Sequence, residues 1–227
     1  ALKKTGKPVV LVVMSGRPLI LTWEDKNMDA ILETWFGGTE AGHAIADLLF
    51  GIANPSGKLS MTFPASIGQI PIYYNHKNTG RPIDPNQKYT TKYLDLSNEP
   101  LYPFGYGLSY TKFGYSEITL SKTELKAGEK LQVKVTVSNE GNFDGEETVQ
   151  LYVRDMVGSI TRPVKELKGF QKLFLKKGEM KEVTFQISTE DLKFYNQDLK
   201  WVYEPGEFKI FAGTDSRTNK EASFRVL

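Results

Sequence analysis

The sequence Leu-Gln-Val-Lys-Val-Thr-Val-Ser at residues 131–138 alternates strictly between apolar and polar side chains. Because successive side chains of a β-strand point to opposite faces, this period of two predicts a strand with one buried face. The same alternation recurs at residues 149–153, 183–187 and 224–226. Short turn sequences that contain glycine separate the runs: Ala127-Gly128-Glu129, Asn139-Glu140-Gly141-Asn142, Lys177-Gly178-Glu179 and Glu204-Pro205-Gly206. Residues 113–227 are therefore predicted to form an antiparallel β-sandwich.

The first half of the chain has a different pattern. Residues 9–13, Val-Val-Leu-Val-Val, form a continuous apolar run, which is typical of a parallel strand covered on both faces. Residues 30–36 are predicted to form a second strand, and a helix is expected from about Thr39 to Phe50. Gly51 stands where a left-handed C-terminal cap is expected. Strand, turn and helix indicate an α/β layered domain, but residues 1–112 hold too few strands for a complete sheet.

The run from residue 65 to residue 112 shows almost no periodicity, which is unusual inside a compact domain. Its prolines and tyrosines include Pro71, Pro82, Pro85, Pro100, Pro103, Tyr73, Tyr74, Tyr89, Tyr93 and Tyr102. We interpret it as an extended arm that packs its aromatic rings over a neighbouring surface. The alternative is a loop that brings a tyrosine to a substrate cleft.

The end of this run is rich in aromatic and apolar side chains at nearly every other position: Phe104, Tyr106, Leu108, Tyr110 and Phe113. A free linker would be polar and flexible. Gly105 and Gly107 between these side chains permit close approach of the backbone to another surface. The segment is therefore predicted to be a fixed strap that buries its rings between the two halves of the chain.

Two motifs resemble a known family. Residues 54–64, Asn-Pro-Ser-Gly-Lys-Leu-Ser-Met-Thr-Phe-Pro, and residues 103–111, Pro-Phe-Gly-Tyr-Gly-Leu-Ser-Tyr-Thr, resemble the C-terminal half of the family 3 glycoside hydrolases, the β-glucosidases and their relatives. Residues 147–153 and 162–170 resemble the fibronectin type III-like domain that ends many of these enzymes. The resemblance implies a partial C-terminal α/β domain with a long arm, followed from residue 113 by a fibronectin type III-like sandwich.

The resemblance also implies an activity for a longer parent protein, the exo-acting hydrolysis of terminal β-linked sugars. In the family, the nucleophile is an aspartate of an N-terminal barrel, and the acid/base glutamate lies upstream of the strand that residues 9–14 match. Neither motif matches a position here, so no catalytic residue is assigned. The piece is expected to be inactive alone and to serve as scaffold and cleft wall, with the barrel domain and a glycoside or oligosaccharide substrate as its partners. The alternative is a non-catalytic carbohydrate-associated or dimerisation module, which would form a homodimer.

The acidic residues were considered as a catalytic pair, since a retaining glycosidase holds two carboxyl groups about 5–5.5 Å apart. Glu24 and Asp25 are interpreted as part of a solvated turn. Glu33 falls on the second predicted strand, but one carboxylate is not a pair. Glu40 is expected in the first helical turn, where the helix dipole favours a negative charge, and this structural role outweighs a catalytic one.

Ligands of open α/β sheets bind beside the loops that follow the strands. Arg17 and Glu40 lie in such loops and are the candidate substrate-binding residues. Arg17 is more simply explained by a buried ion pair within its own domain. Trp35 and Trp201 could stack on a sugar ring, but each is expected within a strand, where a tryptophan is more often part of the core.

The composition excludes several other classes of protein. A net charge of +2 without a basic run gives no support for nucleic-acid binding, and no apolar run is long enough to span a membrane. The chain has no cysteine, and His43 and His76 lack a metal-ligand pattern, so no metal site is predicted. No phosphate-binding glycine loop opens a helix, so no cofactor is expected. The sequence begins with no signal segment, although the resemblance implies a periplasmic or secreted parent.

Overall fold

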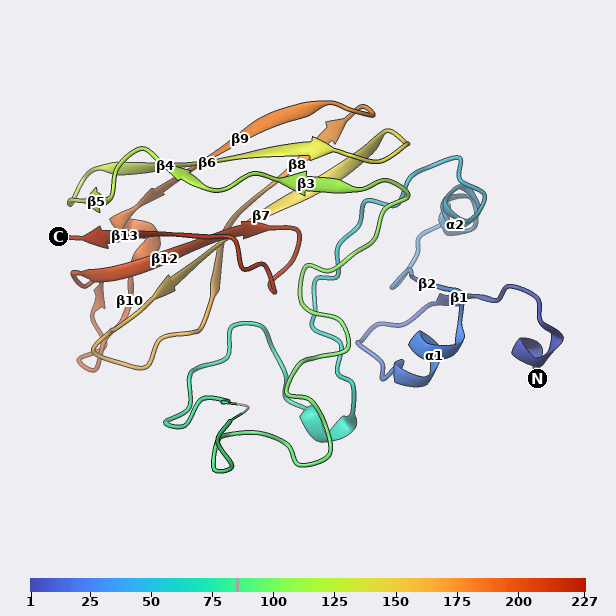
Figure 1. The fold of residues 1–227 in the computed structure, drawn as a ribbon, viewed down its shortest axis with the longest axis horizontal. Helices are drawn as coiled ribbons and strands as arrows, with labels where there is room; N and C mark the ends of the chain where they lie inside the picture. The colour runs from blue at the N-terminus through green and yellow to red at the C-terminus, as the bar shows by residue number, and fades with distance from the viewer. Residues whose placement is uncertain (85) are drawn as a thin grey trace.

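The computed structural model describes residues 1–84 and 86–227. Figure 1 shows a small α/β region that contains the N-terminus, a β-sandwich that contains the C-terminus, and an extended arm that runs between them. We call residues 1–64 the α/β region, residues 65–112 the arm, and residues 113–227 the sandwich. The arrangement confirms the predicted fold class, an incomplete parallel α/β layer followed by an antiparallel β-sandwich.

The α/β region is built on two paired parallel strands. Its elements in chain order are η1 (Leu2–Thr5), β1 (Val10–Val13), α1 (Thr22–Asn27), β2 (Ala30–Glu33) and α2 (Ala41–Leu49). Val13 and Glu33, the last residues of the two strands, are partners in the sheet. The loops that follow β1 and β2 therefore leave the sheet at the same edge.

The prediction that the first strand is covered on both faces is wrong for this chain. Val10 is 48% exposed, and only Val13 at the end of β1 is buried. The apolar cluster of this region has three buried members, Val13, Leu21 and Phe63, with partly buried side chains around them. Among the described residues, too few elements pack on the strand pair to cover both of its faces.

The predicted helix is present but shorter than expected. It runs over α2 (Ala41–Leu49) instead of Thr39–Phe50, and Leu49 is exposed. Gly51 has a φ of +74°, and the next N–H, of Ile52, donates to the carbonyl oxygen of Asp47 at 2.8 Å. The left-handed cap at Gly51 is confirmed, since this bond satisfies a carbonyl that the helix end leaves free.

Two local predictions for this region are wrong. Glu24 and Asp25 lie in helix α1 and not in a solvated turn, and the Tyr102 hydroxyl donates to Asp25 at 2.7 Å. The second strand ends at Glu33, three residues before Phe36. Trp35 has a φ of +52°, a left-handed conformation that a strand cannot contain.

The sandwich consists of two sheets. Its elements are β3 (Phe113–Tyr115), β4 (Thr119–Leu120), β5 (Glu124–Leu125), β6 (Lys130–Asn139), β7 (Gly145–Asp155), β8 (Glu166–Leu175), β9 (Met180–Ser188), η3 (Thr189–Leu192), β10 (Phe194–Tyr195), β11 (Trp201–Val202), β12 (Gly206–Gly213) and β13 (Glu221–Val226). One sheet has the order β5-β13-β12-β7-β8; in the other, β6 pairs with β9 on one side and with β3 and β4 on the other. All pairs are antiparallel except β13 with β5.

The alternation predicted for residues 131–138 is confirmed, because every second side chain of β6 is buried. Leu131, Val133 and Val137 have no exposed surface, and they belong to one continuous apolar cluster with side chains of the facing sheet. Burial of this much apolar area is the main stabilising contribution to a domain of this size. The sandwich therefore has a complete core of its own.

The strap prediction is partly confirmed. Phe104 is half-buried and stacks on Tyr74, with ring centroids 4.5 Å apart. A Cβ atom on Gly105, whose φ is +80°, would lie 2.1 Å from the Gln150 side chain, so the backbone does approach the sandwich closely. Leu108 and Tyr110 are exposed, contrary to the expectation that all of these side chains are buried.

Polar contacts fix the strap to the sandwich. Gln150 of β7 donates to the carbonyl oxygens of Gly105 at 3.1 Å and of Thr214 at 2.6 Å. Lys58 of the α/β region lies 3.0 Å from the carboxylate of Glu147, and both side chains are largely buried, at 12% and 3% exposure. Charged groups in such a place stabilise the fold only while they remain paired. The two halves are thus joined by defined hydrogen bonds and a largely buried ion pair.

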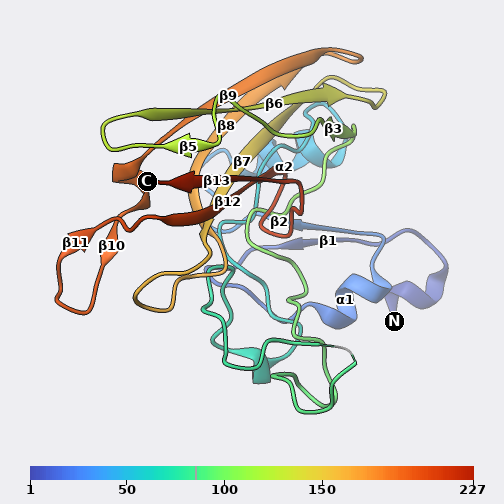
Figure 2. The same cartoon turned by 60° about the vertical axis from the view of Figure 1, so that its left-hand side comes forward.

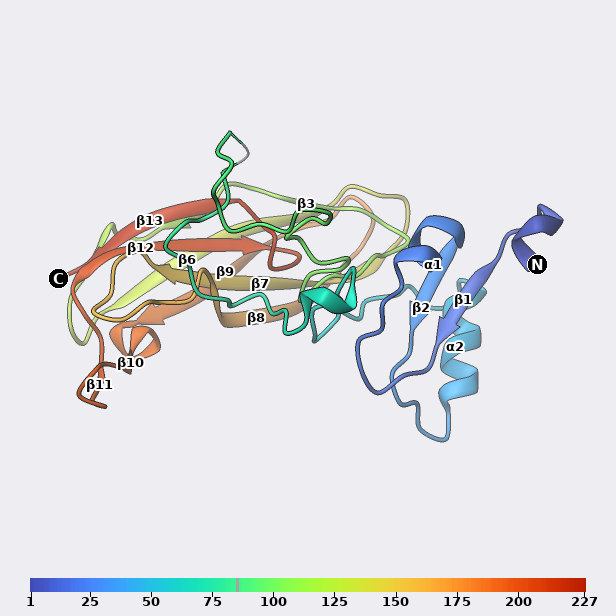
Figure 3. The same ribbon diagram turned by 90° about the horizontal axis from the view of Figure 1, so that it is seen from below.

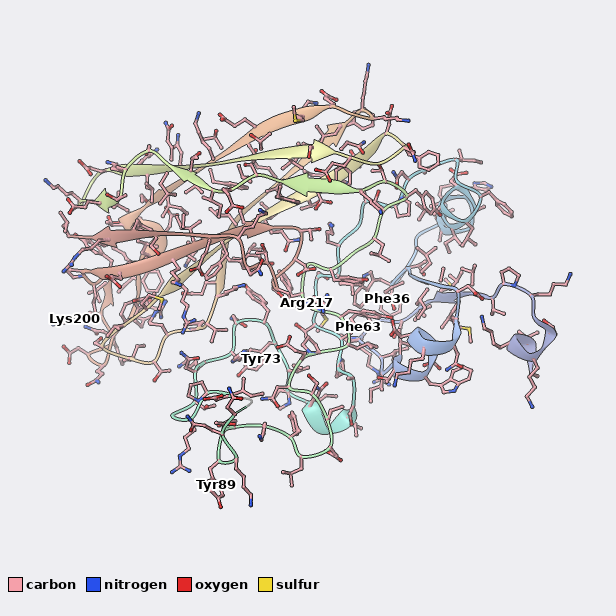
Figure 4. The ribbon with its side chains drawn as sticks, viewed as in Figure 1. Phe36, Phe63, Tyr73, Tyr89, Lys200 and Arg217 are labelled. Atoms are coloured by element: carbon pink, nitrogen blue, oxygen red, sulfur yellow. The ribbon has the colours of Figure 1, made fainter. Side chains whose placement is uncertain are left out.

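The arm packs along the sandwich at the start of β8, as interpreted from its sequence (Figure 3). The N–H of Val164 donates to the His76 carbonyl at 2.9 Å, and the N–H of Leu167 donates to the Tyr74 hydroxyl at 3.2 Å. Within the arm the only regular element of the described residues is η2 (Ile67–Gln69), and Pro85 lies outside the described residues. Tyr89 is exposed at the outer end of the arm (Figure 4).

Candidate functional site

The candidate site is the edge of the α/β sheet where β1 and β2 end. The N–H and the hydroxyl of Thr34 both donate to the Val13 carbonyl, at 2.9 and 3.0 Å, and so hold the two departing loops together. A Cβ atom on Gly16 would lie 2.4 Å from the ring of Phe36, so the second loop packs directly on the backbone of the first. Both candidate loops are thereby placed side by side.

Glu33 is the acidic side chain that this edge partly buries. One carboxylate oxygen, Oε1, accepts from the N–H of Trp35 at 2.9 Å, and the other, Oε2, is buried without a hydrogen-bond partner among residues 1–84 and 86–227. Burial raises the pKa of the Glu33 carboxyl, and the backbone N–H groups of Trp35 and Ser15 offset part of that rise. Trp35 itself takes a left-handed conformation, with a φ of +52°.

Arg17 is in the loop after β1, and its position contradicts the buried ion pair expected from the sequence. Its side chain is exposed and contacts no carboxylate within the described ranges. The loop itself is ordered by Ser15, whose hydroxyl donates to the Arg17 carbonyl at 3.0 Å. The guanidinium thus lies at the surface, although the partly buried Glu33 carboxylate belongs to the same edge.

Glu40 is in the loop after β2, immediately before α2. The sequence placed it in the first helical turn, but it occupies the position that precedes Ala41 and makes no capping bond with its side chain. Its carboxylate lies 2.7 Å from Nδ1 of His43, and both groups are largely exposed. No bond joins Arg17 to Glu40 in the described structure, although the sheet brings both to one edge.

A row of aromatic rings forms one side of this region. Trp35 meets Phe63 edge to face at 5.8 Å, Phe63 lies 6.0 Å from Tyr102, and Tyr102 stacks on Tyr106 at 5.3 Å. Burial and the bond to Asp25 raise the pKa of the Tyr102 hydroxyl above its ordinary value. Phe63 lies in the motif at residues 54–64 and Tyr102 among the arm tyrosines, but neither was predicted from the sequence as a site residue.

The two tryptophans differ from their predicted positions. Trp35 is half-buried in the row of rings but stands after the strand, not within it. Trp201 is within a strand, β11, but is 53% exposed instead of part of the core. Its strand belongs to a two-stranded hairpin outside the two main sheets, so neither of those sheets covers its outer face.

His43 contacts Glu40, His76 contacts a backbone carbonyl, and nowhere in the described ranges do three ligand-type side chains gather as a metal ion would need. Among the helices that the structure describes, none combines the length and the apolar character needed to cross a bilayer.

Comparison with known proteins assigns the chain to a family. Residues 1–110 match the glycosyl hydrolase family 3 C-terminal domain, and residues 147–216 match the fibronectin type III-like domain. The chain belongs to glycoside hydrolase family 3, as the motifs at residues 54–64 and 103–111 indicated.

The similar proteins are enzymes with longer chains. The periplasmic beta-glucosidase of Salmonella typhimurium is 56% identical over all of this chain and 30% of its own length, and a beta-xylosidase of Formosa agariphila is 45% identical over 96% and 30%. The structure of a beta-glucosidase from Listeria innocua in complex with glucose superposes with a TM-score of 0.95 at 49% identity, over 99% of this chain and 32% of that one. The chain thus spans about 30% of the length of these relatives.

Proposed function

We propose that this chain is the C-terminal part of an exo-acting β-glucosidase-type glycoside hydrolase that removes terminal β-linked sugars. The observation that carries the proposal is the likeness over the whole chain to beta-glucosidases, including a structure that holds glucose. A Listeria innocua mutant enzyme of the same fold, 48% identical, is in complex with laminaribiose, which supports an oligosaccharide as the substrate. We also propose that the boundary between the two domains lies between residues 112 and 113.

In this proposal the chain supplies scaffold and cleft wall, and the chemistry comes from elsewhere in the parent. Hydrolysis by a retaining enzyme needs two carboxyl groups about 5–5.5 Å apart. Glu33 is partly buried at the candidate edge, but no second carboxylate contacts it among the described residues. Binding without a nucleophile and an acid gives no turnover, so the chain alone is expected to be inactive.

We further propose that an N-terminal barrel domain of the parent covers the α/β region. Several large apolar side chains are exposed there: Val10, Met14, Trp23, Phe36, Phe50 and Ile52. So many exposed apolar side chains in one small region indicate an interaction surface. Because Arg17 and Glu40 lie at the edge where both strands end, they would border the substrate cleft formed with the barrel and bind sugar hydroxyls. The periplasmic beta-glucosidase among the relatives supports a periplasmic or secreted parent.

The experiment is complementation. The chain is purified from a host that lacks β-glycosidases and assayed on a panel of aryl β-glycosides, alone and mixed with the separately produced N-terminal portion of the parent. We expect no hydrolysis by either piece and recovered hydrolysis in the mixture. Hydrolysis by the chain alone, or an inactive mixture of two pieces that bind each other, would contradict the proposal.

A matched pair of variants tests the role of the edge. Arg17→Ala is expected to raise KM for the aryl glucoside in the mixture, while Arg225→Ala on β13 of the sandwich is expected to leave KM unchanged. Equal kinetics for both variants would remove Arg17 from the cleft.

A further inference from the structure

The hairpin of β10 and β11 presents two aromatic rings to the solvent at one end of the sandwich. Tyr195 pairs with Trp201 across the two strands, and their ring centroids are 4.8 Å apart with the planes inclined by 52°. Tyr195 is 60% exposed and Trp201 is 53% exposed. Figure 2 shows the hairpin projecting from the end of the sandwich that is remote from β1 and β2.

The inner face of the same hairpin is well packed, so the outer rings are held in place. Phe194, next to Tyr195, is buried, and the guanidinium of Arg162 lies 4.1 Å from the centre of its ring. Because side chains alternate along a strand, burying Phe194 inward fixes Tyr195 outward. The fold of the hairpin therefore holds Tyr195 and Trp201 at the surface.

Internal hydrogen bonds hold the hairpin loop. The side-chain oxygen of Asn196 accepts from the N–H groups of Asp198 and Lys200, both at 3.0 Å. Leu199 takes a φ of +58°, which glycine or asparagine adopts more easily, and its own N–H donates to the Asn196 carbonyl at 3.0 Å. Figure 4 shows Lys200 at the outer end of the sandwich, away from the arm. A loop ordered in this way loses little entropy when a ligand binds.

The hairpin loop and the segments next to it in the fold carry polar side chains that bond to one another. Gln197 donates to the Ser159 carbonyl at 3.3 Å, and the Glu204 carboxylate accepts from the N–H of Ser159 at 2.8 Å. Tyrosine and tryptophan combine an apolar face with a polar edge, so the surface suits a ligand that has both apolar and hydroxyl-bearing faces. A β-linked glucose chain has this character, because its ring C–H groups form flat apolar faces between equatorial hydroxyls.

The size of the surface argues against a protein partner. A stable protein interface buries about 800 Å² on each partner, which is several times what two half-exposed rings and a leucine can offer. A few stacked sugar residues need only the rings and their polar surroundings. We propose that Tyr195 and Trp201 form a binding site for chains of β-linked glucose residues. This inference rests on the proposed function, since a β-glucosidase-type parent is the kind of protein that encounters such chains.

Affinity electrophoresis of the whole chain tests the proposal. Native gels are run with and without soluble barley β-glucan, laminarin or hydroxyethyl cellulose. We expect at least one of these glucans to retard the wild-type chain and Trp201→Ala to weaken that binding about ten-fold, the loss expected when a principal stacking face is removed. The control is Phe170→Ala on β8, since Phe170 is 66% exposed but has no ring partner among the described residues; it should be retarded like the wild type.

Several outcomes would overturn the proposal. They are a wild-type chain that no glucan retards, Trp201→Ala retarded like the wild type, or Phe170→Ala weakened as much as Trp201→Ala. Sedimentation of the wild type and of Trp201→Ala would show whether the rings form an interface between two copies instead, which also overturns it. If the complementation mixture hydrolyses aryl glycosides while no glucan retards the chain, only this inference fails. If glucans retard the chain but a mixture of two pieces that bind each other is inactive, the proposed function fails and the binding site stands.

Discussion

The sandwich and the α/β region of this chain differ in how completely their apolar side chains are buried. In the sandwich, buried side chains of both sheets form one continuous cluster, and Leu131, Val133 and Leu151 have no exposed surface. In the α/β region the buried apolar side chains are three, and β1 exposes Val10 at 48%. The difference teaches that one half of the chain completes its own core, whereas the other half has apolar faces that only further structure can cover.

The strongest way to break this comparison is to separate the halves. We expect residues 114–227 alone to fold, because their core needs no side chain of the first half, and residues 1–112 alone not to fold, because two strands with few neighbours cannot offset the entropy of ordering them. Amide dispersion in NMR spectra of the two pieces measures this. A well-dispersed spectrum for residues 1–112 beside a collapsed one for residues 114–227 would reverse the comparison.

Substituting a valine by alanine in each of the two regions sharpens the comparison of their packing. Val133→Ala removes two buried carbon atoms from the sandwich and should lower the free energy of unfolding by about 2–3 kcal/mol. Val10→Ala makes the same chemical change on an exposed position of β1 and should cost less than about 1 kcal/mol. Urea denaturation measures both. Equal losses would show that β1 is as well packed as β6.

A third prediction concerns the strap between the regions. Phe104 is half-buried and stacks on Tyr74, so Phe104→Ala should lower the free energy of unfolding by about 1–3 kcal/mol, less than for a fully buried ring. Leu108→Ala is the control, because Leu108 is exposed in the same segment and should change little. An unchanged unfolding midpoint for Phe104→Ala together with lost binding to a glucan would make Phe104 part of a sugar-binding platform instead.

The smallest expected effect concerns pH. Burial raises the folded-state pKa of Glu33 above its unfolded value, so the protonated carboxyl favours folding. The stability that this group contributes is complete below the unfolded pKa and is lost as pH rises through the folded pKa. Glu33→Gln, which resembles the protonated form, should therefore raise the melting temperature slightly at pH 7 and not at pH 4. A lower melting temperature for Glu33→Gln at pH 7 would show that the ionised carboxylate is favoured.

Features that depend on a few neighbouring residues could be predicted from the sequence. The strand at residues 131–138 follows from alternation, and the cap at Gly51 follows from the low cost of a left-handed glycine. The family follows from motifs at residues 54–64 and 103–111, which the comparison confirms. Each of these signals is contained within a dozen residues.

Features set by distant contacts could not be predicted. The bond from Tyr102 to Asp25 joins residues 77 positions apart, and no short pattern shows it. Trp35 follows its strand in a left-handed conformation that tryptophan rarely adopts, and no pattern in the sequence marks this position. Trp201 is exposed because its hairpin stands outside both sheets, which depends on topology and not on its neighbours in sequence.

Hydrogen exchange tests most directly the claim that the sandwich is complete in itself while the α/β region is completed by the rest of a family 3 enzyme. Exchange is followed on the whole chain, first alone and then with the N-terminal portion of the parent. We predict that the amides of β6 and β7 are strongly protected in both samples, and that those of β1 and β2 exchange far faster in the chain alone and slow down markedly in the mixture. Equal protection of β1 and β6 in the chain alone, with no change on mixing, would contradict the claim.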